Sequence, residues 1–340
     1  MKRFIYHMCI CLSAASCSMP EYEKPLDEDG AGELVISVGS SSLESRSSEV
    51  LDYEQAVRNV QILVFDSSGK LGMYMNAGTR MTSLKMRLAV GEYDVWAVLN
   101  GPDCSRVRNL NSLVRQEVML GEWNSTGPAG RFMMAGHNAV TVTTGRAVDL
   151  TVTVERLVSR VYVGNVTNNL PESFGDIFVQ GVFLANVVGN QYVGGGAQPR
   201  VWYNRYGSPT GVQGEYADGT YLKAECADMT WRTIGRSIRH GESSDLQASL
   251  YSYRNDVTEF PFFPEPFTRS GPVLFLYVRI GDTWYHLDKE LPVGLYENNT
   301  VRLDLQITGM TVPGDKEVGI RINNCQVTPW QLVSSGNYDI

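Results

Sequence analysis

The sequence is poor in the residues and spacings that build enzyme active sites. Only four of its 340 residues are histidines, and none stands in an H-E-x-x-H motif or at metal-ligand spacing from another. There is no G-x-S-x-G nucleophile elbow, and the glycine run Gly194–Gly196 lacks the Lys-Ser/Thr pair that completes a phosphate-binding loop. His240 has a carboxylate nearby and could act as a base, but a surface-loop histidine is the favoured interpretation. We therefore expect no enzymatic activity, no metal and no cofactor.

Basic residues are also few. Lysine and arginine number 29 against 37 aspartates and glutamates, so the net charge is −8, and no basic cluster occurs. This balance argues against binding to nucleic acid or to an anionic membrane surface. Charged residues make up only 19% of the chain, whereas glycines number 33, a balance that favours many strands and turns over long solvated helices.

No apolar run is long enough to span a bilayer, but the first residues resemble an export signal. Two basic residues precede the apolar stretch Phe4–Leu12, and the small residues Ser13–Ser16 lead to Cys17. This pattern predicts a lipoprotein signal over residues 1–17, with Cys17 as the lipidated first residue of the mature protein. The position three places before the cysteine is Ala14 rather than the usual leucine, so an ordinary secretory signal is the alternative.

The cysteines do not form a disulfide framework. Three of the six belong to the export segment, and the other three are odd in number, far apart and without C-x-x-C spacing: Cys104, Cys226 and Cys325. A single disulfide among them is one reading, and three buried free thiols are the favoured one.

The rest of the chain reads as short strands separated by turns. Residues 18–32 are acidic and turn-rich, typical of a solvated spacer. The best helix candidate, 110–120, is short, and Ser159–Arg160 is the expected domain junction. This pattern predicts an all-β sandwich architecture. The strand-like runs are 34–38, 57–65, 84–90, 93–99, 139–142, 147–163, 178–188, 273–280, 284–287 and 301–307.

Five segments are informative when they are taken together and in order. They are V-R-N-V-Q-I-L-V-F-D-x-x-G-K-L at 57–71, G-E-Y-D-V-W-A-V-L-N-G-P at 91–102, F-M-M-A-G at 132–136, V-T-V-E-R-L-V at 152–158, and 284–309. Their order and spacing over nearly the whole chain resemble those of the Bacteroidales fimbrillins, the type V pilins.

The resemblance implies two transthyretin-like, Greek-key β-sandwich domains in tandem, with a short helix. It also implies export as a lipoprotein to the outer membrane, maturation by a trypsin-like protease after an arginine, and polymerisation by strand exchange in extracellular fimbriae. The partners would be other fimbrial subunits, including anchor and tip proteins. The expected division is a propeptide of spacer and detachable first strand at 18–46, an N-terminal domain at 47–158, a C-terminal domain at 159–316 and a donor-strand tail at 317–340.

The sequence contains a segment suited to detachment. Leu34, Ile36 and Val38 occupy every second position, which places them on one face of a strand. A Ser-rich stretch follows, and a cut in it between Arg46 and Ser47 would free that strand. The alternative is that Arg46 is an ordinary loop arginine.

The C-terminal tail repeats this alternation, so it is the predicted donor strand. Past Asn323–Asn324 the apolar phase slips by one residue, which would turn the side chains to the other face and divide the donor into two pieces. The alternative is a plain last strand at 318–322. The expected donor residues are Val318, Ile320, Ile322, Val327 and Trp330.

Three functions remain open: a stalk subunit, a terminal subunit that is either an anchor or a tip adhesin, and a surface glycan-binding lipoprotein. A stalk subunit needs both a cleavage site and a donor tail, and the presence of both favours it. An anchor subunit would keep its first strand and lipid, and a tip adhesin would lack the donor tail. A surface glycan-binding lipoprotein would instead need an exposed aromatic platform.

Lipidation is directly testable. Replacing Cys17 by alanine is expected to abolish labelling by a fatty-acid analogue and to block delivery to the cell surface, because the thiol of Cys17 is the group acylated. Unchanged labelling of this variant would contradict the lipoprotein interpretation.

Overall fold

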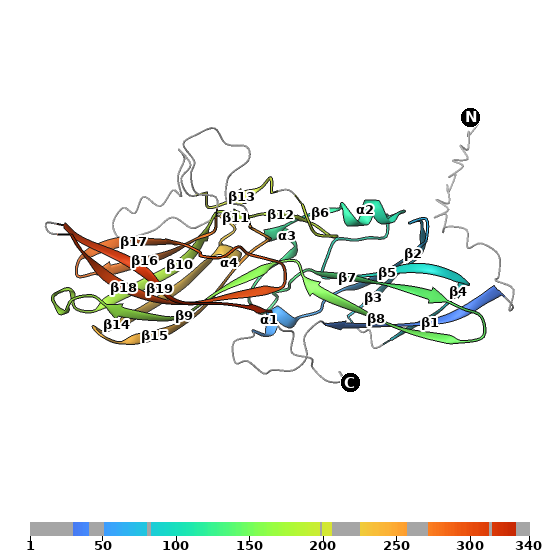
Figure 1. Ribbon diagram of the computed structural model, residues 1–340, viewed down its shortest axis with the longest axis horizontal. Coiled ribbons are helices and arrows are strands. Elements are labelled where there is room, and N and C mark those ends of the chain that lie inside the picture. Colours follow the sequence, from blue (N-terminus) through green and yellow to red (C-terminus); the bar gives the residue numbers. More distant parts are fainter. Residues whose placement is uncertain are drawn as a thin grey trace, which may run out of the picture.

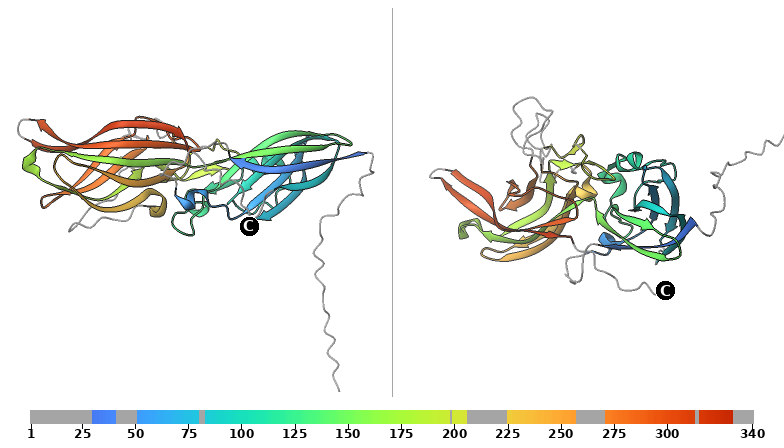
Figure 2. Two further views of the ribbon diagram at one scale, coloured as in Figure 1. Left: turned by 90° about the horizontal axis from the view of Figure 1, so that it is seen from below. Right: turned by 45° about the vertical axis from the view of Figure 1, so that its right-hand side comes forward.

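The computed structural model describes residues 30–40, 51–79, 83–197, 199–205, 225–256, 271–312 and 315–330. Strands dominate them, which confirms the predicted all-β fold. The strands gather into two lobes placed end to end, as Figures 1 and 2 show. The chain passes from one lobe to the other at residues 157–158, next to the expected junction at Ser159–Arg160. That each lobe is an independent sandwich domain stays a prediction.

The first lobe is one seven-stranded sheet folded over on itself, in the order β3-β2-β5-β7-β8-β1-β4. β7 and β8 pair only at Met134–Arg156 and Ala135–Glu155, so the sheet divides there into two halves that face each other across an apolar core. The strands are β1 (Ala31–Ser40), β2 (Val60–Asp66), β3 (Leu71–Gly78), β4 (Leu84–Ala89), β5 (Gly91–Leu99), β7 (Met134–Val142) and β8 (Ala147–Arg156).

Strand β2 is buried on both faces, which explains its four consecutive apolar residues, Ile62–Phe65. Ile62 and Val64 face the core of the first lobe, whereas Leu63 and Phe65 belong to a second apolar cluster that continues into the other lobe. A strand buried on both sides has no polar face, so its sequence does not alternate.

The second lobe has two four-stranded sheets with an apolar cluster between them, in the orders β15-β9-β18-β19 and β14-β10-β16-β17. β9 and β18 are parallel, and the other pairings in these two sheets are antiparallel. The strands are β9 (Ser159–Asn169), β10 (Ile177–Ala185), β14 (Trp231–Ile238), β15 (Ser243–Ser252), β16 (Val273–Ile280), β17 (Thr283–Glu290), β18 (Asn299–Val312) and β19 (Asp315–Pro329).

The remaining elements are short. The helix predicted over 110–120 is wrong in extent, because only α2 (Leu110–Val114) is helical at its start. The chain then forms β6 (Glu117–Met119), which pairs with β12 (Asn190–Tyr192) and buries Val118 completely. Tertiary pairing therefore overrides local helix propensity here.

The other short elements are α1 (Asp52–Gln55), α3 (Leu120–Trp123), η2 (Glu172–Phe174), β11 (Val187–Val188), β13 (Trp202–Tyr203) and α4 (Ala227–Thr230).

Candidate strand-exchange site

The first strand, β1, is an inner strand of its sheet. It pairs antiparallel with β4, from Ala31–Ala89 to Ile36–Leu84, and parallel with β8, from Glu33–Ala147 to Ser40–Val154. Leu34 and Ile36 are 0% exposed, and Val38 is partly buried. The three residues predicted to share one face therefore do so, and that face is the core of the first lobe.

The backbone of β1 sits close to the chain beyond β7. A Cβ atom at Gly32 would come within 2.3 Å of the carbonyl oxygen of Thr143, a distance that no side chain tolerates. Only glycine lets the strand lie this deep between its neighbours. Removing β1 would leave unpaired N–H and C=O groups on β4 and β8, and an apolar groove between them.

The last strand, β19, is held differently. It pairs antiparallel with β18 along its whole length, and it has no strand on its other side among the described residues. Ile320 is 9% exposed, Val318 and Ile322 are partly buried, and Val327 is 46% exposed. Its apolar face thus covers part of the second lobe's core, and burial weakens toward its end.

The shift in apolar phase predicted at Asn323–Asn324 corresponds to a β-bulge. Asp304 pairs with Asn324 and the next residue, Leu305, with Ile322, so Asn323 is the extra residue. A bulge absorbs one residue and lets the side chains after it return to their former face. In this conformation β19 is consequently one bent strand and is not divided into two pieces.

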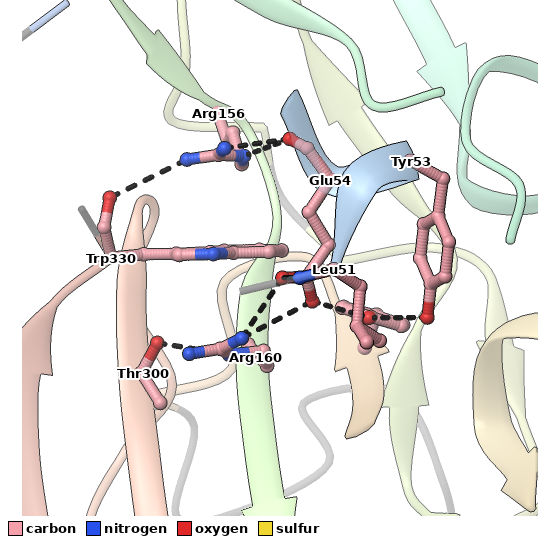
Figure 3. Close-up of polar contacts among 8 residues, drawn as sticks. Leu51, Tyr53, Glu54, Arg156, Arg160, Thr300 and Trp330 are labelled. Carbon is pink, nitrogen blue, oxygen red and sulfur yellow. Dashed lines mark hydrogen bonds and ion pairs between the residues drawn. The ribbon is translucent and has the colours of Figure 1, made fainter. Parts of the chain in front are cut away.

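Immediately after β19, Trp330 enters the interior at the junction of the two lobes. It is 1% exposed, and its indole lies between the guanidinium groups of Arg156 and Arg160, at the ends of β8 and β9 that meet there (Figure 3). The guanidinium carbons lie 4.4 Å and 5.1 Å from the ring centre, respectively. Both faces of the ring therefore make cation–π contacts in a dry environment, where such contacts are strongest.

Glu54, from α1, connects the two arginines, and it is fully buried. Its carboxylate accepts hydrogen bonds from Arg160 Nη1 at 3.0 and 3.2 Å and from the Tyr251 hydroxyl at 2.7 Å. Its main-chain carbonyl accepts from Arg156 Nε at 3.0 Å and Nη2 at 2.6 Å. We call Glu54, Arg156, Arg160, Tyr251 and Trp330 the junction cluster.

The electrostatics of the junction cluster are set by burial. Desolvation lowers the pKa of Arg156 to about 9, against the attraction of Glu54, and raises the pKa of Tyr251 well above its usual value. The carboxylate of Glu54 thus forms an ion pair with Arg160 and only attracts Arg156 through space. The side-chain donors of Arg156 bond to main-chain carbonyl oxygens, those of Glu54 and, at 3.4 Å, of Trp330.

Sequence reasoning missed the junction cluster as a unit. A signal existed in Arg156 and Arg160, the two basic residues of the longest strand-like run, 147–163. Charged residues in such a position need buried partners, but nothing in the sequence names Glu54 as the partner.

The cysteines and the cleavage-site residues singled out in the sequence lie outside the junction cluster. Cys17, Arg46 and Ser47 lie outside the described residues. Cys104, Cys226 and Cys325 are free thiols, of which only Cys104 is fully buried. Burial raises the pKa of Cys104 and Cys226 to about 12. Within the described ranges, no cluster of His, Cys, Asp and Glu is suited to a metal ion, and no helix has the length and apolarity of a membrane span.

The fold of this chain is similar to the folds of several known proteins. Neither a protein-family model nor a curated protein matches the sequence. The fimbrilin FimA of Porphyromonas gingivalis W83 matches with a TM-score of 0.59 and 14% identity, over 89% of this chain and 99% of that one. The C-terminally truncated tip fimbrial protein Mfa3 of P. gingivalis gives 0.55 and 14%, over 88% and 100%. A Bacteroides eggerthii protein provisionally named for cell adhesion gives 0.56 and 13%, over 88% and 97%.

These matches show that the chain has the fold of Bacteroidales fimbrial proteins, which confirms at the level of the fold the resemblance seen in the sequence. The matched proteins are named for fimbriae and adhesion, and none is named as an enzyme. Since a fimbrilin and a tip protein both match, the fold does not decide between stalk and tip.

The junction cluster leads to a stability prediction. Glu54→Ala is expected to lower the free energy of unfolding by about 3–5 kcal/mol, because it leaves the buried guanidinium group of Arg160 without its carboxylate partner. The measurement is denaturant unfolding at neutral pH. Glu242→Ala is the control, because Glu242 forms an exposed ion pair with Arg239 and its loss should change stability little. Equal losses in the two variants would contradict the structural role of Glu54.

Proposed function

We propose that the chain is a subunit of a cell-surface fimbria and that it polymerises by donor-strand exchange. The observation that carries this proposal is the place of β1, an inner strand that precedes the predicted cleavage site and yet buries Leu34 and Ile36 completely and Val38 partly. One cut after Arg46 separates this strand from the rest of the chain. The shared fold with a fimbrilin and a tip protein supports the same role.

In this proposal the lipid on Cys17 carries the precursor to the outer membrane, where a trypsin-like protease cuts between Arg46 and Ser47. Signal removal and this cut together take away four basic and seven acidic residues in positions 1–46, so the net charge changes from −8 for the full chain to −5. Departure of β1 opens the groove between β4 and β8. The mature subunit then stays a separate monomer only until a strand of another subunit fills that groove.

The strand that fills the groove is the C-terminal tail of a neighbouring subunit. Ile320 and its alternating neighbours can replace Leu34, Ile36 and Val38, since both segments place apolar side chains at every second position. Each such side chain contributes about 1.5–3 kcal/mol on burial, so three of them contribute roughly 5–9 kcal/mol before the backbone hydrogen bonds are added. Stalk, anchor and tip subunits of the same fimbria are the partners.

The alternative of a surface glycan-binding lipoprotein has less support. Among the described residues, Tyr296 is the one aromatic side chain in the group of large apolar residues that are exposed. A single tyrosine is not the aromatic platform that this function requires.

Maturation can be tested on protein taken from the cell surface. We expect N-terminal sequencing to give Ser47 as the first residue, and Arg46→Ala to leave a form that begins at Cys17 and does not polymerise. Lys24→Ala, which changes another basic residue of the removed segment, should be processed normally. A wild-type surface form that begins at Cys17 would instead indicate an anchor subunit.

The donor role of the tail can be tested without disturbing the monomer. Val327→Asp is expected to leave the monomer's stability within about 0.5 kcal/mol, because this side chain is 46% exposed. It should abolish ladders of Arg46-cleaved protein, because a carboxylate buried in a neighbour's groove costs several kcal/mol.

Gln326→Asp is the matched control, because Gln326 is the adjacent, exposed residue on the opposite face of β19. Normal ladders from Val327→Asp would exclude this position from the donor. Ile320→Asp and a chain ending before Glu317 are less discriminating, because Ile320 and Trp330 are also buried in their own subunit.

A further inference from the structure

Beyond its backbone pairing with β18, the end of β19 has one buried side-chain attachment to its own subunit. The residues from 326 to 329 are exposed, and then Trp330 is almost completely buried. Its main-chain N–H donates to the carbonyl oxygen of Asn298, and its indole packs edge-on against Phe132 and parallel to Tyr251. The side-chain packing of the final part of the strand is therefore concentrated in Trp330.

This attachment depends on the ring faces of Trp330. Its indole Nε1 is buried and makes no hydrogen bond to the described residues, whereas Arg156 and Arg160 cover the two faces of the ring. A cation–π contact needs no directional hydrogen bond, so the ring can slide out without breaking one. Tryptophan gives the strongest contact of this kind.

We propose that Trp330 is a latch that keeps the tail on its own subunit, and that its release from between Arg156 and Arg160 is the step that frees the donor strand. This proposal rests on the donor role of the tail proposed above. The latch restrains a strand that is otherwise held along one edge only, and it limits premature exchange between subunits.

The latch is built on the segment that follows the predicted cleavage site. Glu54 orients both arginines, and the main-chain N–H of Leu51 donates to Glu54 Oε2 at 3.0 Å, which ties the start of α1 to the same carboxylate. Figure 3 shows α1, the two arginines and Trp330 in direct contact. One cluster thus anchors both α1, which follows the predicted propeptide, and Trp330, which follows β19.

The test compares Trp330→Phe with Trp231→Phe in the full-length chain. Phenylalanine fills part of the site but has a weaker cation–π contact. Trp231 is similarly buried, packs on Phe183 at 5.8 Å between ring centres, and lies outside the junction cluster. We expect amide hydrogens of residues 318–329 to exchange about tenfold faster in Trp330→Phe, and those of β9 and β16 to be unchanged. Trp231→Phe should leave the exchange of residues 318–329 as in the wild type.

Exchange in residues 318–329 that is unchanged, or that rises only together with the whole chain, would overturn the latch. A second measurement follows ladder formation by the Arg46-cleaved forms, which should be faster for Trp330→Phe. Ladders that form at the wild-type rate despite faster exchange would overturn the gating role. Faster exchange with no ladders from any form, wild type included, would leave the latch supported and refute donor-strand exchange.

Discussion

Two buried guanidinium groups set the structure of the junction between the lobes. A charge removed from water must find counter-charges and hydrogen-bond acceptors within its own protein, because its desolvation is otherwise too costly. Arg156 and Arg160 lie at the ends of β8 and β9 that meet at this junction, so their partners have to come from segments distant in the sequence. Glu54 comes from α1, Tyr251 from β15 and Trp330 from the end of β19, and meeting these demands brings the three segments to one point.

The two segments linked to strand exchange differ in how many sides hold them. β1 has backbone partners on both edges, β4 and β8, and two of its side chains are fully buried. β19 has a backbone partner on one edge only, β18, and its burial decreases along its length. Local opening is easiest where fewest contacts have to be broken. Opening of β19 therefore breaks one ladder of backbone hydrogen bonds, whereas opening of β1 breaks two and exposes two fully buried side chains.

Much of this arrangement could be predicted from periodicity, and the rest could not, for physical reasons. The apolar run 57–65 corresponds to β2, and the alternation at Leu34 predicts which face of β1 is buried, because side-chain direction in a strand follows from local geometry. The helix expected over 110–120 ends early because the chain pairs with residues 190–192, a contact between segments far apart in sequence. Glu54 was missed for the same reason, since its partners lie about 100 residues away or more.

The bulge at Asn323 shows how a local irregularity preserves a long-range match. The sequence phase changes there, and in a regular strand Cys325 and Val327 would turn away from the core. The extra residue instead bends β19, so that Cys325 stays opposite Leu303 and Val327 opposite Val301. If the tail pairs with a neighbouring subunit as proposed, the residues before Asn323 keep their alternation on any regular partner strand. The residues after it keep the same face only where the new partner also accommodates the bulge.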